Sequence, residues 1–367
     1  MSAITVGGDL VHYETLGRGR AVVLLHGWIG SWRYWVPTMQ HLHLKYKVYA
    51  IDLFGFGDSA KNPRRYPIEE QIRMVQFVLD ALDLKRAALI GHGLGAWIAA
   101  EIARRAPDSV ARMMLISAPL YSPVDLDHRA PPMRMRASAV HGTMDPDKTI
   151  YNAEGLRGVR PLASLGRGGY DDKPASRPRQ PSIADLGPGD PTIPNARLLN
   201  QVKLEEAARA QAERQAAGLD IPDPNPQNPL YQLLAAQSPD SLLNRCVRRT
   251  DGLYNRLGPD VSRIDGRVLR ETAIFYDAGR MLDNLRVIPV PTVLVHGQND
   301  PLIPSPDEAV WNYLTHEKEE LCVPIPVPGG HFPMSEYDNF HRLLTGFLDA
   351  NDLREFEVKE RWRRRSR

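Results

Sequence analysis

The sequence ALIGHGLGAWIAAEIARRAP, residues 88–107, carries the clearest structural signal in this chain. Its first residues complete a short apolar run that ends in the small-residue turn Gly91-His92-Gly93-Leu94-Gly95. A helical pattern follows over residues 96–106 and stops at Pro107, because proline cannot continue a helix. This order predicts a buried strand, a sharp turn and a helix that packs back on the strand.

Further apolar runs of strand length repeat this arrangement along the chain. Each ends in turn residues, and helical patterns such as that of residues 68–82 separate them. The runs occupy residues 21–25, 47–51, 113–117, 292–296 and 322–327. Alternating strands and helices predict an α/β fold with a mostly parallel central sheet flanked by helices. Chemistry in such sheets gathers at the carboxyl ends of the strands, where all the motifs described below are expected.

The middle of the chain, residues 120–287, interrupts this alternation. A segment rich in proline, glycine and arginine extends over about 140–194, too long for an ordinary loop. Helices are expected over 196–217, from Ser238-Pro239-Asp240 onward, and over about 265–285. We interpret the whole segment as a large helical, Pro-rich lid over the active-site face.

Composition places the chain among ordinary globular proteins. Its 367 residues are 43% hydrophobic and 25% charged, with a formal net charge of +2, a balance that does not favour a nucleic-acid partner. The sequence shows no secretory signal pattern and no apolar run of transmembrane length. The two cysteines, Cys246 and Cys322, favour free thiols and a cytoplasmic location, although one disulfide stays open.

Four motifs occur in a characteristic chain order. They are His26-Gly27-Trp28, the run DLFGFGDS at residues 52–59, the turn at residues 91–95, and Asp300 with His331. With this set the sequence resembles the α/β-hydrolase superfamily, in the branch with a lid inserted after the sixth strand. The resemblance covers about residues 10–120 and 287–350. It implies a core of residues 1–119 and 288–350, a lid of residues 120–287 and a basic C-terminal tail of residues 351–367.

The resemblance implies a role for each motif residue. His331 would act as a general base, and Asp300 would hold its imidazole in the useful tautomer. The backbone amides of Trp28 and Leu94 would form an oxyanion hole. The family's nucleophilic serine is replaced here by Gly93, which has no side-chain oxygen. An acyl-enzyme at this position is therefore chemically excluded.

Nothing nearby is an obvious replacement for the missing serine. His92 is adjacent, but alternate residues of such a turn point elsewhere. Ser31 follows the motif His26-Gly27-Trp28. It would have to make a new contact with His331 to serve as a nucleophile. Gly93 could also be an introduced change in a working serine hydrolase, which the sequence of the native gene would decide.

We therefore expect a pseudoenzyme, a non-hydrolytic protein that binds a ligand or serves as a scaffold or complex subunit. The alternative is a hydrolase or lyase that acts on an ester, lactone or carbonyl substrate through the His331–Asp300 dyad and an activated water. The dyad could equally persist as a structural pair. No cofactor and no metal is implied, because neither a phosphate-binding glycine loop nor clustered metal ligands occur.

Three further features have both a functional and a structural interpretation. The Pro-rich segment and the Arg-rich tail suit a protein partner, and the tail also suits an anionic membrane surface or a simple solvated helix end. Residues 141–146, HGTMDP, repeat much of residues 296–301, HGQNDP, which we attribute to coincidence. The aromatic cluster either lines a small-molecule pocket or packs the first loop against the lid. Its members are Trp28, Trp32, Tyr34 and Trp35.

Overall fold

A computed structural model describes residues 2–129, 227–316 and 321–353. The contacts within the chain divide it at residues 137/138 and 218/219. All the described residues belong to one compact unit, which we call the first unit. The Pro-rich segment, the expected helix over 196–217, the repeat at 141–146 and the tail beyond residue 353 lie outside the described residues.

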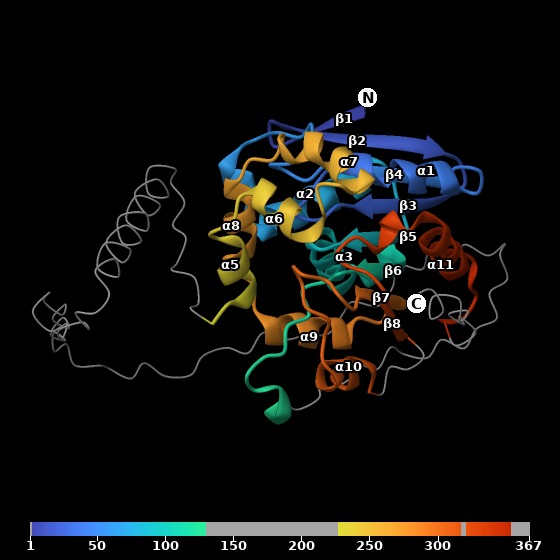
Figure 1. Cartoon of the computed structure of the whole chain (residues 1–367). Helices are drawn as coiled ribbons and strands as arrows, with labels where there is room; N and C mark the ends of the chain where they lie inside the picture. The colour runs from blue at the N-terminus through green and yellow to red at the C-terminus, as the bar shows by residue number, and fades with distance from the viewer. Residues whose placement is uncertain (1, 130–226, 317–320, 354–367) are drawn as a thin grey trace, which may run out of the picture. The chain divides into compact units, whose positions relative to one another are not determined.

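A single eight-stranded sheet forms the centre of the first unit, in the order β1-β2-β4-β3-β5-β6-β7-β8 (Figure 1). The strands are β1 (Ser2–Val6), β2 (Asp9–Gly17), β3 (Arg20–Leu25), β4 (Tyr46–Ile51), β5 (Ala87–His92), β6 (Val110–Ile116), β7 (Thr292–Gly297) and β8 (Cys322–Val327). The six strands from β4 across to β8 are parallel, whereas β1 and β2 pair antiparallel at one edge. The predicted mostly parallel α/β sheet is therefore confirmed.

Helices flank the sheet and continue between β6 and β7. They are α1 (Val36–Leu42), α2 (Ile68–Ala81), α3 (Leu94–Arg105), α5 (Pro229–Leu234), α6 (Pro239–Cys246), α7 (Gly252–Val261), α8 (Arg267–Ala273), α9 (Ala278–Val287), α10 (Glu308–Thr315) and α11 (Tyr337–Asp349). Helix α3 packs on β3, β5 and β6 with α2 and α9 beside it, while α1 packs on β4 and against α11. None of the helices in the described ranges is long and apolar enough to cross a membrane.

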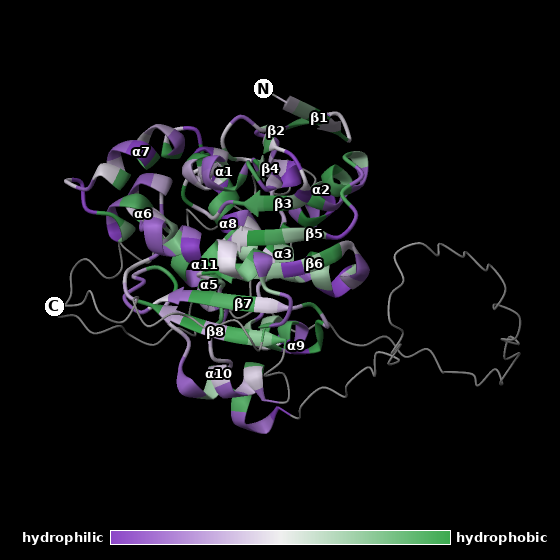
Figure 2. Ribbon diagram, turned by 90° about the vertical axis from the view of Figure 1, so that its right-hand side faces the viewer, coloured by the Kyte–Doolittle hydropathy of each residue, from purple (hydrophilic) through white to green (hydrophobic). Residues whose placement is uncertain are grey.

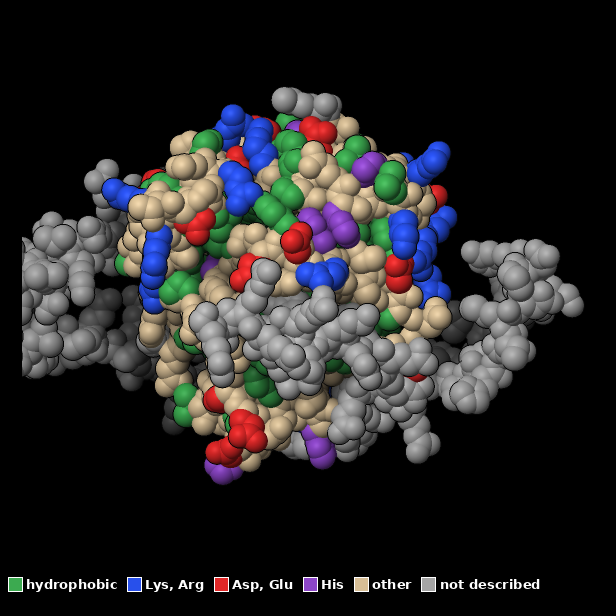
Figure 3. Space-filling model, turned by 45° about the vertical axis from the view of Figure 1, so that its right-hand side comes forward, with side chains coloured by type: hydrophobic (Ala, Val, Ile, Leu, Met, Phe, Trp, Pro, Cys, Tyr) green, Lys and Arg blue, Asp and Glu red, His purple; other side chains and the backbone are tan. Residues whose placement is uncertain are grey.

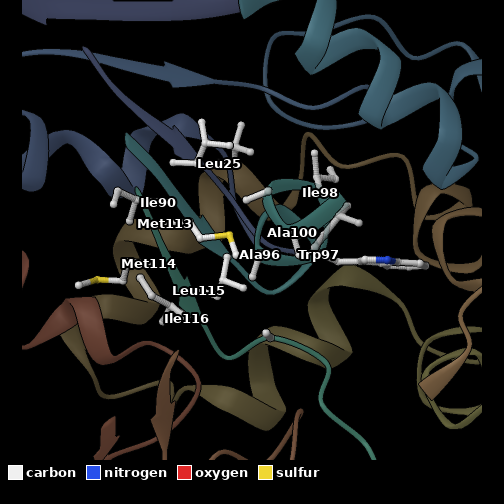
Figure 4. Packing of buried hydrophobic residues seen from close by; sticks show 14 of the residues in the cluster. Leu25, Ile90, Ala96, Trp97, Ile98, Ala100, Met113, Met114, Leu115 and Ile116 are labelled. Carbon is white, nitrogen blue, oxygen red and sulfur yellow. The ribbon is translucent and has the colours of Figure 1, made fainter. Parts of the chain in front are cut away.

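The core lies between α3 and the central strands. Met113 and Leu115 of β6 point toward α3, and Met114 points to the opposite face, as the two-residue period of a strand requires (Figure 4). Figure 2 shows the apolar strands enclosed by helices that are hydrophilic on their outer sides. On the face shown in Figure 3, basic and acidic side chains both occur, with apolar side chains exposed between them.

The helices α5 to α8, which we call the insertion helices, follow β6 as expected for a lid. Ser238 caps α6 as predicted, because its side chain accepts a hydrogen bond from Ser241 N–H. The single helix expected over residues 265–285 is wrong, since the structure has two helices there, α8 and α9. Asp277 starts the second helix by accepting from Arg280 N–H, and the preceding Tyr276 is buried with its hydroxyl donating to Pro119 O.

Candidate functional site

The turn at residues 91–95 joins β5 to α3 and sets the geometry of the site. A Cβ on Gly91 would lie 2.3 Å from Gly95 O, and a Cβ on Gly95 would lie 2.4 Å from Leu25 O. Both positions therefore need glycine so that α3 can approach β3 and β5 closely. Gly93 has φ +51° and ψ −109°, a backbone conformation that side chains rarely adopt and that places its Cα at the start of α3.

Trp28 occupies the space beside Gly93. A Cβ built on Gly93 would lie 3.2 Å from Cε3 and 3.3 Å from Cζ3 of the Trp28 ring. This ring is fully buried, and its Nε1 donates to Thr272 Oγ1 at 3.1 Å on the insertion helix α8. A side chain at position 93 would therefore require the Trp28 indole to shift by a few tenths of an ångström. Its hydrogen bond to Thr272 opposes such a shift.

The structure brings Asp300 and His331 together, although 31 residues separate them. Asp300 follows β7 and His331 follows β8, so that both lie at the carboxyl edge of the sheet with Gly93. His331 Nδ1 donates to Asp300 Oδ2 at 2.8 Å, and both side chains are fully buried. Asp300 Oδ1 accepts from the backbone N–H groups of Leu302 and Ile303 at 2.9 and 3.0 Å.

Hydrogen bonding keeps the Asp300 carboxylate ionised. Burial by itself opposes its ionisation, but the His331 imidazole and two backbone N–H groups hold the pKa of Asp300 well below its usual range. A neutral His331 with its proton on Nδ1, directed at this carboxylate, would present the Nε2 lone pair to the site. The pair therefore presents the geometry and the tautomer of a general base.

Three polar groups at the site have no partner among the described residues. His331 Nε2 is buried without a hydrogen bond. No described residue accepts a hydrogen bond from the N–H of Trp28 or from the N–H of Leu94, the first residue of α3. Buried polar groups are nearly always satisfied, so this combination of one acceptor and two donors suits a bound oxygen-containing molecule.

His92 and Tyr34, whose roles were missed in the sequence, support the base. Gly27 N–H donates to Tyr34 Oη at 2.8 Å, and the Tyr34 hydroxyl lies 3.0 Å from His92 Nδ1. His92 Nε2 in turn donates to the carbonyl of His331 at 2.8 Å, and burial together with the nearby His331 lowers the pKa of His92 well below its usual range. This chain of hydrogen bonds joins the loop after β3 to the loop of His331, and it uses a neutral His92.

The other aromatic and hydroxyl candidates divide between packing and lining roles. Trp28 and Trp35 are fully buried and pack the loop after β3, whereas Trp32 and Tyr34 line a pocket described below. Ser31 is buried and caps the short helical turn Trp32–Trp35, because its Oγ accepts from Arg33 N–H. His331 Nε2 has no partner, so the structure places no Ser31 hydroxyl on it.

Two carboxylates of the run at residues 52–59 form, together with His12, a group whose spacing would admit a metal, and the sequence did not reveal it. Atoms of His12, Asp52 and Asp58 lie within 4.8 Å of one another. Asp52 already accepts from Trp32 N–H, Asp58 N–H and the His12 ring, and Asp58 pairs with two arginine side chains at 2.6 Å each. These carboxylates are therefore neutralised by protein groups, and they hold the loop after β4 in place.

Neither cysteine is in a disulfide, and neither joins the dyad. Cys322 starts β8, and Cys246 ends α6. Burial raises the pKa of the Cys246 thiol above its ordinary range, so this thiol is not activated as a nucleophile.

Comparison with known proteins identifies the same fold. A stretch of 114 residues is 37% identical to the dihydrolipoyllysine-residue acetyltransferase component of an acetoin cleaving system from Pseudomonas putida, and it covers 30% of this chain and 31% of that protein. A stretch of 119 residues is 31% identical to a 2-hydroxy-6-oxo-2,4-heptadienoate hydrolase from Pseudomonas putida, and it covers 31% of this chain and 43% of that protein. The chain thus spans less than half the length of these relatives.

The solved structure of an enol-lactonase from Burkholderia xenovorans has a TM-score of 0.57 and 15% identity to this chain, with 95% of this chain and 100% of that chain covered. This likeness shows the shared fold. Residues 20–159 match the family model described as alpha/beta hydrolase fold. The ordered motifs, the eight-stranded sheet and this match agree that the chain has the α/β-hydrolase fold.

Proposed function

We propose that this protein is a pseudoenzyme with respect to serine hydrolysis, and that it binds a small oxygen-containing ligand without a covalent bond. The observation that carries the proposal is the turn at residues 91–95, which we call the elbow. Gly93 supplies no oxygen, and the Trp28 ring lies 3.2 Å from where a side chain would begin. The chain therefore keeps the shape of the family's turn while lacking the group that forms an acyl-enzyme.

The polar groups around this turn favour a site that binds a ligand over a site that serves only a structural role. His331 Nε2 is a buried acceptor without a partner, and the N–H groups of Trp28 and Leu94 are donors without acceptors in the described part of the chain. Leaving one such group unsatisfied costs about 1–3 kcal/mol. A ligand with a hydroxyl and a neighbouring carbonyl or alkoxide oxygen would satisfy all three.

A trifluoromethyl ketone is a direct probe of this arrangement, because its hydrate in water presents two oxygens on one carbon. We expect 1,1,1-trifluoro-4-phenylbutan-2-one to bind the unmodified protein reversibly in calorimetry, with no change in intact mass. His331→Ala should weaken binding roughly tenfold, because the hydrogen bond from a ligand hydroxyl to His331 Nε2 is lost. His316→Ala, at an exposed histidine, is the matched control and should leave affinity unchanged. Equal affinity for both variants would refute the proposal.

A second candidate function is favoured by the assembled dyad. With Nδ1 held by Asp300 at 2.8 Å, His331 Nε2 could take a proton from a water as that water's oxygen bonds to a substrate carbonyl carbon. The N–H groups of Trp28 and Leu94 would stabilise the oxyanion, and His331 would return the proton to the leaving oxygen as its bond breaks. The result is hydrolysis of an ester or lactone without an enzyme adduct.

Turnover of p-nitrophenyl acetate separates the two functions. A water-based enzyme should lose its activity in His331→Ala, lose most of it in Asp300→Asn, and show no adduct by intact mass during turnover. Binding of the ketone with no turnover would leave the ligand-binding function alone. Hydrolysis that persists unaltered in His331→Ala would rule out the dyad mechanism.

The scaffolding form of the proposal concerns the Pro-rich segment and the Arg-rich tail, which lie outside the described residues. In this form the segment and the tail bind a protein partner, and peripheral contact with an anionic membrane is the alternative. The proposed location is a reducing cytoplasm, which suits two cysteines that form no disulfide. Size-exclusion chromatography of native material should show a complex or a co-purifying ligand. A clean monomer with an empty pocket would count against it.

A further inference from the structure

A pocket lies close to the dyad, although none of Gly93, Asp300 and His331 lines it. Its volume is about 440 Å³, within the range of small-molecule sites. Three segments enclose it: the chain after β3, the helix α7, and the chain that follows His331. Most of its lining is apolar, from Trp32, Tyr34, Val36, Leu253, Phe332 and Met334.

Tyr34 and Phe332 form the wall that separates this pocket from the dyad. Their ring centroids are 6.0 Å apart at 80°, an edge-to-face contact. His92 packs on both rings, at 5.8 Å from Tyr34 and 5.2 Å from Phe332, and His331 lies 5.2 Å from Phe332. The two histidine rings therefore pack against the side of this wall that faces away from the pocket. Because the wall rings are held by these contacts, we expect the pocket to keep its shape without a ligand.

The charged residues lining the pocket are both arginines. Arg33 is already neutralised, because it contacts Asp58 at 2.6 Å and Asp260 at 3.5 Å. Arg256, on α7, donates to the Tyr337 hydroxyl, and its guanidinium carbon lies 5.2 Å from the Tyr337 ring centroid. Among the described residues no carboxylate pairs with Arg256. Arg256 is exposed, and its guanidinium thus borders an apolar pocket without a carboxylate partner among the described residues.

We propose that this pocket binds a small amphipathic carboxylate, with the carboxylate on Arg256 and the apolar body against Trp32, Tyr34 and Phe332. Guanidinium groups pair with carboxylates in a planar, two-bond geometry, and the apolar walls remove the rest of such a ligand from water. An aromatic acid and a medium-chain aliphatic acid share this chemistry. The site is separate from the vacated elbow and does not rest on the function proposed for it.

Calorimetry with 2-naphthoate and with decanoate tests the site and distinguishes the two sources of ligand. We expect at least one of them to bind the full chain, and Arg256→Gln to weaken that acid roughly five- to tenfold, through loss of a charge-assisted pair. The neutral analogue 2-naphthamide should bind Arg256→Gln and the unmodified protein equally. Arg248→Gln removes the same charge from an exposed position outside the pocket, so it should leave all affinities unchanged.

Filling the pocket gives an independent result. Leu253→Trp should abolish binding of acid and amide alike, with Val36→Trp, at another lining residue, as the substitute if Leu253→Trp fails to fold. The proposal is overturned if neither acid binds up to millimolar concentration. It is also overturned if Arg256→Gln and Arg248→Gln weaken binding equally, or if the folded pocket-filling variant still binds with unchanged affinity.

Discussion

Replacing Gly93 with serine tests the elbow and the dyad together. The residue has φ +51°, and the new Cβ would lie 3.2 Å from Trp28, whose Nε1 is held by Thr272. A strained positive φ costs of order 1–3 kcal/mol, and the tight ring contact adds to it, so we expect Gly93→Ser to lose about 2 kcal/mol of stability. This loss lowers the melting temperature by roughly 4–8 °C.

Gly93→Ala is the matched control, because it adds the same Cβ without the oxygen. Both variants should melt at the same lowered temperature, but only Gly93→Ser should gain the mass of a fluorophosphonate adduct. Labelling should vanish in Gly93→Ser combined with His331→Ala, since the base is then missing. A folded Gly93→Ser that does not label would refute the view that His331, Asp300 and the two N–H groups remain assembled. Melting of Gly93→Ala at the unmodified temperature would refute the strain argument.

Three further changes test the supports of the site. His92→Phe breaks the hydrogen bonds to Tyr34 and to the His331 carbonyl, and it should lower the free energy of unfolding in urea by about 2–3 kcal/mol. Thr272→Val leaves Trp28 Nε1 buried without an acceptor and should cost about 1–2 kcal/mol in the same assay, whereas a cost near zero would show that the indole is not held from the insertion helix α8. Burial, and after it the nearby His41, lowers the pKa of His341 to about 4. As the pH falls below about 6.5, this histidine is therefore protonated in the unfolded chain before it is protonated in the folded chain. Stability should therefore fall by about 2 kcal/mol between pH 6.5 and pH 4, and His341→Gln should remove that part of the acid sensitivity; an identical pH profile for the variant would contradict the assignment.

The parallel half of the sheet could be predicted from local pattern. Six strands are short apolar runs bounded by turn residues, because a strand buried on both faces must be apolar throughout. The edge strands β1 and β2 were missed, because most of their residues are exposed or half-buried and so form no apolar run of strand length. The break between α8 and α9 was missed because the burial of Tyr276 and its contact with Pro119 depend on residues far away in sequence.

The sequence by itself determined the α/β-hydrolase fold, the strand–turn–helix turn at residues 91–95 and the lack of a side-chain nucleophile at Gly93. Those conclusions follow from residue types at local spacings, which short-range sterics and hydrophobic periodicity control. Only the tertiary structure decided that Trp28 packs on Gly93, that His92 and Tyr34 brace His331, and that Arg256 borders an apolar pocket. Each of these joins segments from separate parts of the chain, and their distances depend on how the sheet and the insertion helices pack.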